Sequence, residues 1–151
     1  MENVNDVLKS AATKLGNQVK FDGLMSQKAH IKNNIGTSDK DILGWDYVVH
    51  WNDRCYMYYA AQPPLSGMTQ PQPIPCPLGI RIFNEYKIDL KQAIDIFHSS
   101  NAGDKFIKLA LYYPLTPEVT EPLWSFLTSI GNTIIIGANT GKVHQMADLY
   151  C

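Results

Sequence analysis

The chain has 151 residues, a formal net charge of −1 and 45% hydrophobic residues. This composition suffices for one compact fold, and the near-neutral charge gives no indication of the strongly basic surface that nucleic-acid binding needs. No apolar run approaches the roughly 18 residues needed to cross a bilayer, and the first residues lack the basic and apolar parts of a signal peptide. We therefore expect a soluble, cytoplasmic protein with no nucleic-acid partner and no membrane insertion, or an exported one if a leader has been removed.

The amino-terminal residues predict a helix, an extended segment and a polar loop, in that order. Residues 3–15 carry apolar side chains at helical spacing, and Gly16 supplies a stop. The imperfect alternation of residues 18–26 suggests a strand, whereas residues 28–40 are polar and predict a loop.

Residues 45–60 give the strongest local signal of the first half, a β-hairpin. Its two arms are rich in β-branched and aromatic residues, and the Asn-Asp-Arg sequence at 52–54 between them is typical of a turn. In residues 62–77, repeated prolines remove the amide donors that a helix or an inner strand needs. We interpret this segment as a linker or a long surface loop.

The second half predicts a similar series of elements. In chain order they are a short strand at 78–83, a helix at 89–99 capped by Asp89, a strand or continued helix at 105–113, a proline-rich connection at 114–122 and a hairpin at 123–136.

The two halves therefore share the order helix, strand, hairpin. This order predicts an α+β fold with helices packed on one face of a mostly antiparallel sheet, and it raises the hypothesis of two tandem α-β-β-β halves. The boundaries follow as an amino-terminal half at 1–61, a proline-rich loop or linker at 62–77 and a carboxy-terminal half at 78–151. The halves could also form one compact domain.

The three cysteines, Cys55, Cys76 and Cys151, form neither a CxxC pair nor an even-numbered framework. An odd number of cysteines without metal-ligand spacing is typical of a reducing compartment, so we expect free thiols rather than a disulfide. The four histidines are scattered without HxH or HxxxH spacing. The sequence thus predicts neither a metal site nor a cofactor.

Two short motifs allow a chemical interpretation, and both favour a structural one. The stretch 137–142 (GANTGK) follows three isoleucines, as a phosphate-binding loop would, but it has the wrong glycine spacing and no Ser or Thr after the Lys. We interpret it as a turn with Gly141 at positive φ. His50 and Cys55 could face each other across the first hairpin as a nucleophile pair. We favour the simpler interpretation that both residues lie on one face of a sheet without a chemical role.

Three stretches of the second half carry a family resemblance. They are Ile88–Ile94 (IDLKQAI), Trp124–Phe126 (WSF) and Ile134–Val143 (IIIGANTGKV). Across about residues 80–145 they resemble the PepSY domain, whose helix opens on an Ile-Ser/Asp-hydrophobic-Glu/Lys-x-Ala-Ile pattern and which closes on Thr-Gly-x-Val. The resemblance implies a helix on an antiparallel sheet that binds or inhibits, as in propeptides of thermolysin-like proteases, and the N-terminal half is a candidate for a second copy.

Aromatic side chains are the candidate binding residues, because those not needed for the core could anchor a peptide or a small ligand. They are Trp45, Tyr47, Trp51, Tyr56, Tyr58 and Trp124. Packing within the core is the alternative explanation for the same residues.

No catalytic constellation accompanies these residues, so the sequence favours a non-enzymatic binding or regulatory module that recognises a protein or peptide. The alternative is a small-molecule-binding protein or enzyme with a pocket between helix and sheet. A free edge strand would also allow a homodimer. A binding module should show an exposed apolar patch or sheet edge, whereas a pocket protein should show convergent buried polar groups.

Overall fold

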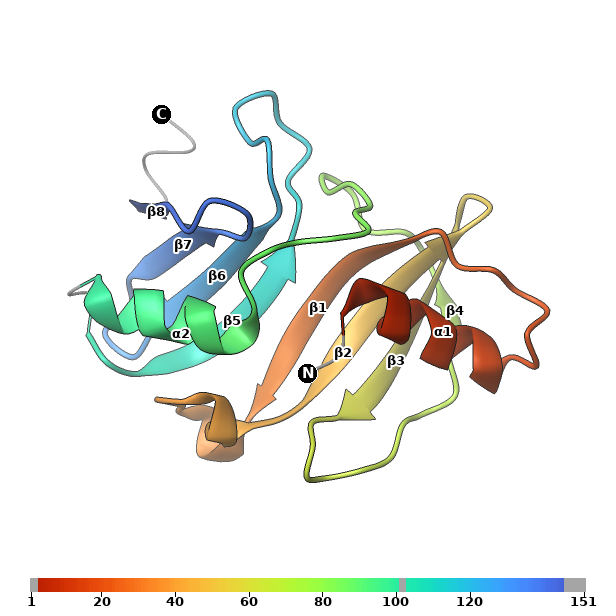
Figure 1. The fold of residues 1–151 in the computed structure, drawn as a ribbon, viewed down its shortest axis with the longest axis horizontal. Coiled ribbons are helices and arrows are strands. Elements are labelled where there is room, and N and C mark those ends of the chain that lie inside the picture. Colours follow the sequence, from red (N-terminus) through yellow and green to blue (C-terminus); the bar gives the residue numbers. More distant parts are fainter. Residues whose placement is uncertain (1–2, 101–102, 146–151) are drawn as a thin grey trace.

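The computed structural model describes residues 3–100 and 103–145, and these form one continuous antiparallel sheet in the order β4-β3-β2-β1-β5-β6-β7-β8 (Figure 1). The strands are β1 (Gly23–Ile31), β2 (Ile42–Trp51), β3 (Arg54–Ala61), β4 (Gln72–Ile74), β5 (Phe106–Tyr112), β6 (Leu123–Thr128), β7 (Thr133–Gly137) and β8 (Val143–Gln145). The helices are α1 (Val4–Lys14) and α2 (Leu90–Ser99), with single turns η1 (Lys32–Asn34) and η2 (Asp39–Asp41).

The fold is dominated by this sheet, and the predicted α+β class is wrong. Strands account for 39% of the residues and helices for 19%, so this is not an assembly of helices packed on a sheet. All eight strands belong to one sheet, with β1–β4 on one side of the β1–β5 pairing and β5–β8 on the other, and the hypothesis of two tandem halves stays a prediction. The prediction underestimated the strands: residues 28–31, expected in a loop, extend β1, while β4 and β8 lengthen the sheet at its two edges.

Local sequence signals placed several elements correctly. Both predicted helices form, and each begins after a side-chain cap: Asn3 accepts from the amide of Asp6, and Asp89 accepts from that of Gln92. The two hairpins are also confirmed, as the pairs β2–β3 and β6–β7. Residues 106–112 form strand β5 rather than a continued helix.

The centre of the sheet is a short seam between β1 and β5. Only three residue pairs join these strands, from Ser26–Tyr112 to Lys28–Ala110. Other segments bridge the seam beyond each end: Phe83 pairs with Leu24, and Gly36 pairs with Phe106. The strand predicted at 78–83 is therefore wrong, since only isolated bridges form there.

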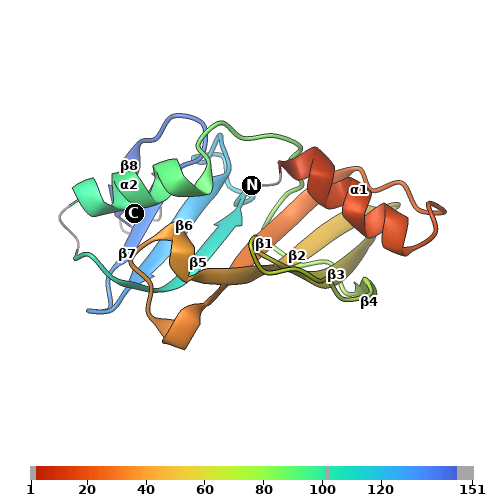
Figure 2. The same ribbon diagram turned by 60° about the horizontal axis from the view of Figure 1, so that its bottom comes forward.

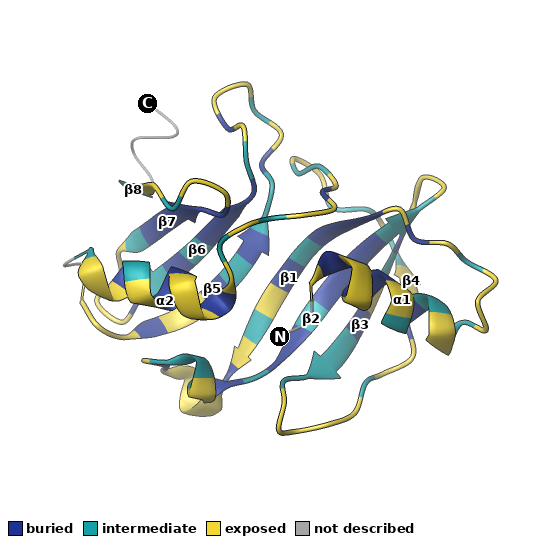
Figure 3. Cartoon of the chain, in the orientation of Figure 1, coloured by how far each residue is buried: buried dark blue, intermediate teal, exposed yellow. Residues whose placement is uncertain are grey.

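The two helices lie on the same side of the sheet, α1 near β1–β3 and α2 near β5–β7 (Figures 1 and 2). Their buried sides meet the largest apolar cluster, which includes Trp45, Phe97, Phe106, Trp124 and Phe126. Figure 3 shows this division, with buried residues beneath the helices and exposed residues on their outer surfaces. The helices are 11 and 10 residues long, and within the described residues no helix is long and apolar enough to span a membrane.

The opposite face carries a smaller cluster and a disulfide between Cys55 and Cys76. The prediction of free thiols is thus wrong for these two residues, and Cys151 lies outside the described residues. The sequence did not reveal this disulfide, because the two cysteines meet only where the chain folds back on itself. The proline-rich segment, expected to be only a loop, folds back as β4 along β3, and Ile74 pairs with Cys55. Cys76, two residues later, then reaches its partner.

Candidate functional site: the groove between the helix starts

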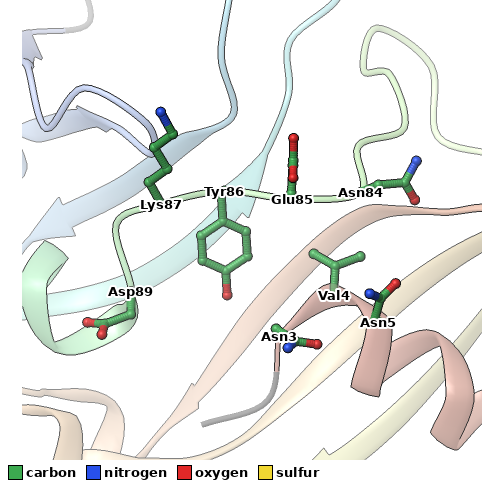
Figure 4. Close-up of a pocket in the computed structure, with 8 residues that line it drawn as sticks. All are labelled: Asn3, Val4, Asn5, Asn84, Glu85, Tyr86, Lys87 and Asp89. Carbon is green, nitrogen blue, oxygen red and sulfur yellow. The ribbon is translucent and has the colours of Figure 1, made fainter.

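A groove of about 540 Å³ lies between the first turn of α1 and the segment that leads into α2 (Figure 4). We call it the interhelical groove. Its lining residues are Asn3, Val4, Asn5, Asn84, Glu85, Tyr86, Lys87 and Asp89. The volume falls within the range of roughly 300–1,000 Å³ that is typical of ligand sites.

The first wall of the groove is the amino-terminal turn of α1. Asn3 caps this helix, its side-chain oxygen accepting the amide hydrogen of Asp6 at 3.0 Å. The carboxamide nitrogen of Asn3 is not used by this cap, and Asn5 is exposed beside it. Val4 is buried and fixes the turn to the core. This wall therefore presents amide groups that can both donate and accept hydrogen bonds.

The second wall is an irregular segment, residues 84–87, which we call the strap. It is fixed at both ends: the amide of Phe83 donates to Leu24 at 3.0 Å, and the amides of Lys87 and Ile88 donate to the carbonyl of Ala138 at 3.0 and 2.7 Å. Between these points the main chain of residues 84–86 forms no hydrogen bond with the described residues. Figure 4 shows the strap as an irregular stretch opposite the first turn of α1. Its backbone donors and acceptors are therefore available to a ligand.

Tyr86 points from the strap into the groove, with its hydroxyl toward the sheet (Figure 4). Its ring packs edge-to-face on Trp124, with 5.8 Å between the centroids, and at 6.4 Å on Phe83. Burial, and secondarily the carboxylate of Asp89, raises the pKa of Tyr86 to about 12. The hydroxyl thus stays protonated near neutral pH, where it can donate or accept a hydrogen bond.

The start of α2 closes the groove at Asp89. This residue and Gln92 form a reciprocal cap, with distances of 2.8 and 2.9 Å between side-chain oxygens and amide nitrogens. Both helices thus begin at the groove, which receives the positive end of each helix dipole. The negative charges of Glu85 and Asp89 offset these positive dipole ends and the positive charge of Lys87, so no single sign of charge dominates the lining. The lining includes no Cys, Ser, Thr or His.

The predicted aromatic binding residues lie mostly in the core. Trp45, Tyr47, Tyr58 and Trp124 are between 0 and 5% exposed, whereas Trp51 and Tyr56 are only partly buried. Trp124 contributes to the groove indirectly, since it packs beneath Tyr86 and against Trp45, with centroids 6.1 Å apart in the second pair. Direct contact with a partner stays a prediction, and Trp51 and Tyr56 are the members with surface left for it.

The contacts of the turn at 139–141 are those of a structural turn and not of a phosphate-binding loop. The carboxylate of Glu121 accepts hydrogen bonds from the amides of Asn139 and Thr140 at 2.8 and 2.9 Å, and from the Thr140 hydroxyl at 2.9 Å. Gly141 has the expected positive φ, 74°. A protein carboxylate thus occupies the amide groups that an anion would need, which supports the interpretation of this motif as a turn.

The sequence analysis missed the interhelical groove, although Asp89 was identified as a helix cap. Asn3 and Asn5 are about 80 residues from the strap, which the pairing of Phe83 with Leu24 holds beside β1. Nothing in either segment marks that neighbourhood.

A second cavity, of about 520 Å³, lies under the proline-rich loop near Ile42, Leu43 and Gln62. Gln62 is already engaged there, since its side-chain oxygen accepts the indole hydrogen of Trp45 at 2.9 Å. This cavity offers fewer free polar groups than the interhelical groove.

Within residues 3–100 and 103–145, no group of three or more His, Cys, Asp or Glu side chains is placed to hold a metal ion. Comparison with known proteins adds no relative: no protein-family model matches the chain, and neither a curated protein nor a solved structure is significantly similar to it. The PepSY-like resemblance therefore stays an interpretation of three sequence stretches.

Proposed function

We propose that this protein is a non-enzymatic binding module that holds an extended peptide segment of a partner protein in the interhelical groove. The observation that carries the proposal is the unbonded main chain of residues 84–86 along the wall of a 540 Å³ groove. Peptide-binding modules commonly use such free backbone groups, because main-chain hydrogen bonds to an extended peptide supply affinity whatever the peptide sequence.

The side chains around the strap suit a peptide main chain. Asn3, Asn5 and Asn84 each offer an oxygen acceptor and nitrogen donors, although the Asn3 oxygen is shared with the helix cap. Tyr86 adds a hydroxyl that remains protonated near neutral pH. The mixed charges of Glu85, Lys87 and Asp89 favour a polar peptide with little net charge over a strongly acidic or basic one.

A small molecule in the same groove is the second candidate, because the volume suits one. The two occupants would use different groups. A peptide depends on the backbone amides of the strap, whereas a small ligand can bind through Tyr86 and the asparagine side chains alone.

The proposed experiment selects peptides from a random decapeptide display library and measures their affinity for three variants. Asn5→Trp fills the groove and should weaken binding roughly tenfold or more. Lys91→Trp places the same side chain on the exposed surface of α2, outside the groove lining, and should leave affinity unchanged. Glu85→Pro removes one free backbone amide of the strap. It should weaken the binding of a peptide but not the binding of a small molecule.

Each outcome bears on the proposal. If no peptide is selected, or if Asn5→Trp and Lys91→Trp weaken binding equally, the groove is not a peptide site. If a co-purified or library small molecule binds, is lost in Asn5→Trp and is retained in Glu85→Pro, the second candidate replaces the first. Amide NMR spectra of each variant serve as the check of folding.

We also propose the cellular compartment in which the protein acts. Disulfides form and persist mainly in oxidising compartments. The Cys55–Cys76 bond therefore argues for a site of action outside the reducing cytoplasm that the sequence predicted. Fractionation of the source cells, with alkylation before lysis, would show whether these cysteines are joined where the protein resides.

A further inference from the structure

The β2–β3 hairpin places His50 directly opposite Cys55. A two-residue turn at Asn52 and Asp53 closes the hairpin, so the His50–Cys55 pair is the second from the turn. The carbonyl of His50 accepts the amide hydrogen of Asp22 at 2.9 Å, on the side away from β3. The pair is thus a non-hydrogen-bonded one, the type in which cross-strand side chains lie closest.

Asp22 holds the imidazole of His50 from the other side. Its Oδ1 lies 2.7 Å from Nδ1 of His50. An ionised carboxylate can only accept, so Nδ1 carries the hydrogen and Nε2 remains for another partner. The His50 side chain is 19% exposed and that of Asp22 is 52% exposed. This arrangement orients the ring, as a carboxylate does for catalytic histidines.

The two sulfur atoms of the disulfide differ in accessibility. Cys55 is fully buried, whereas Cys76 is partly exposed and lies near the carbonyl of Asp53, at 4.0 Å. An attacking thiolate would therefore reach the Cys76 sulfur first. The sulfur that leaves is Cys55, the neighbour of His50.

We propose that Cys55–Cys76 is a thiol–disulfide exchange site. His50 is the residue that stabilises or protonates the leaving Cys55 thiolate, and Asp22 positions the His50 ring. The co-reactant is a small-molecule or protein thiol. Its thiolate bonds to Cys76 Sγ and the Cys55–Cys76 bond breaks, with its electron pair passing to Cys55. The imidazolium of His50 stabilises that thiolate or gives it a proton. A second thiol then releases Cys76, so one disulfide forms as one is reduced.

A purely structural disulfide would need neither the histidine nor the carboxylate. The same sheet offers a matched comparison, because His30 and Asp46 form a similar pair on β1 and β2, with 2.8 Å between Nε2 and Oδ2. His30 is paired with Gly44, not with a cysteine. Removal of His30 should therefore leave the disulfide unaffected.

The test measures the rate at which glutathione reduces the disulfide, in a Cys151→Ser background that excludes a third thiol. His50→Gln should slow the reaction on the order of tenfold, because exchange slows when the leaving thiolate is less stabilised. His30→Gln should leave the rate unchanged. Equal rates in His50→Gln and the parent protein, with both folded by circular dichroism, would overturn the proposal.

Two further readouts separate chemistry from folding. Acid quenching after a brief exposure to glutathione should trap the mixed disulfide on Cys76, and trapping on Cys55 would contradict the proposed order of attack. Asp22→Asn should slow reduction, and Asp22→Glu should restore part of the rate because it returns the carboxylate. A loss that Asp22→Glu does not recover would remove Asp22 from the proposal.

Discussion

The halves of the sheet on either side of the β1–β5 seam support their helices in different ways. On the first side, the Tyr58 hydroxyl donates to the carbonyl of Val7 in α1 at 2.7 Å. On the second, the Trp124 indole donates to the carbonyl of Ile88, just before α2, at 2.8 Å. A buried aromatic residue with one polar atom thus holds each helix, but one contact lies inside the helix and the other at its entry.

The halves also differ in how the opposite face and the outer edge are completed. The first half uses the Cys55–Cys76 disulfide and a final strand, β4, flanked and interrupted by prolines. The second half packs the loop residue Val119 against Leu123 and Ile135. Among the described residues the first half is therefore covalently closed at its edge, whereas the second depends on packing. Each prediction below removes one of these supports.

The largest expected effect is the loss of Trp124. Its side chain is fully buried, and Trp124→Ala should destabilise the protein by about 4 kcal/mol, as large aromatic truncations in cores do. Urea unfolding followed by circular dichroism measures the free-energy change. Ile130→Ala, at a residue that is 70% exposed in the same half, is the control and should change stability by less than about 0.5 kcal/mol. If Trp124→Ala lowered the free energy of unfolding no more than Ile130→Ala does, the second half would not depend on Trp124.

Opening the disulfide should have the next largest effect. The cysteines are 21 residues apart, and release of a loop of this length should lower stability by about 3 kcal/mol. The comparison is between oxidised and reduced protein in the Cys151→Ser background, by urea unfolding. Amide exchange should accelerate first in β3 and β4, which the bond joins. Equal acceleration across β6 and β7 would mean that the halves are not separately supported.

The sequence was sufficient for elements whose signals are local. The helix at Leu90–Ser99 has a cap, a buried stripe and an end within ten residues, and the first hairpin has its turn at Asn52 and Asp53. These features depend on neighbours in the chain, so periodicity and turn chemistry reveal them.

Elements that depend on distant partners were missed. Lys28 and His30 are exposed because one face of β1 is open at that point, and their polarity made a strand resemble a loop. Ile74 joins the sheet only by pairing with Cys55. The groove and the disulfide have the same origin, because each brings together segments that no local pattern connects.

The Tyr58 hydroxyl provides a smaller and more selective test of the first half. Tyr58→Phe keeps the ring and removes the hydrogen bond to Val7, which should lower stability by about 1 kcal/mol. Because the contact lies within α1, amide exchange should accelerate in that helix and not in α2. Hydrogen exchange read by mass spectrometry measures both helices at once. Equal acceleration in α2 would show that the two helices are coupled across the seam.

The smallest expected effect concerns Asp41, in the connection between β1 and β2. Its carboxylate accepts hydrogen bonds from the amides of Thr37 and Ser38 at 2.8 and 3.2 Å, and these bonds lower the pKa of Asp41 below its ordinary value of 3.8. The carbonyl of Thr37 in turn contacts the His98 ring of α2. Asp41 therefore orders a segment that touches both halves.

The sign of the pH effect follows from the direction of this shift. A carboxyl group with a lowered pKa in the folded state stabilises the protein above the unfolded pKa, and this contribution is lost as pH falls through the folded pKa. Asp41→Asn should thus be less stable than the parent at pH 6, by less than about 1 kcal/mol for so accessible a group. The difference should shrink toward pH 2.5. Urea unfolding at both values measures it, with Asp39→Asn as the control, and a difference that persisted at low pH would mean that Asp41 acts through packing rather than through its charge.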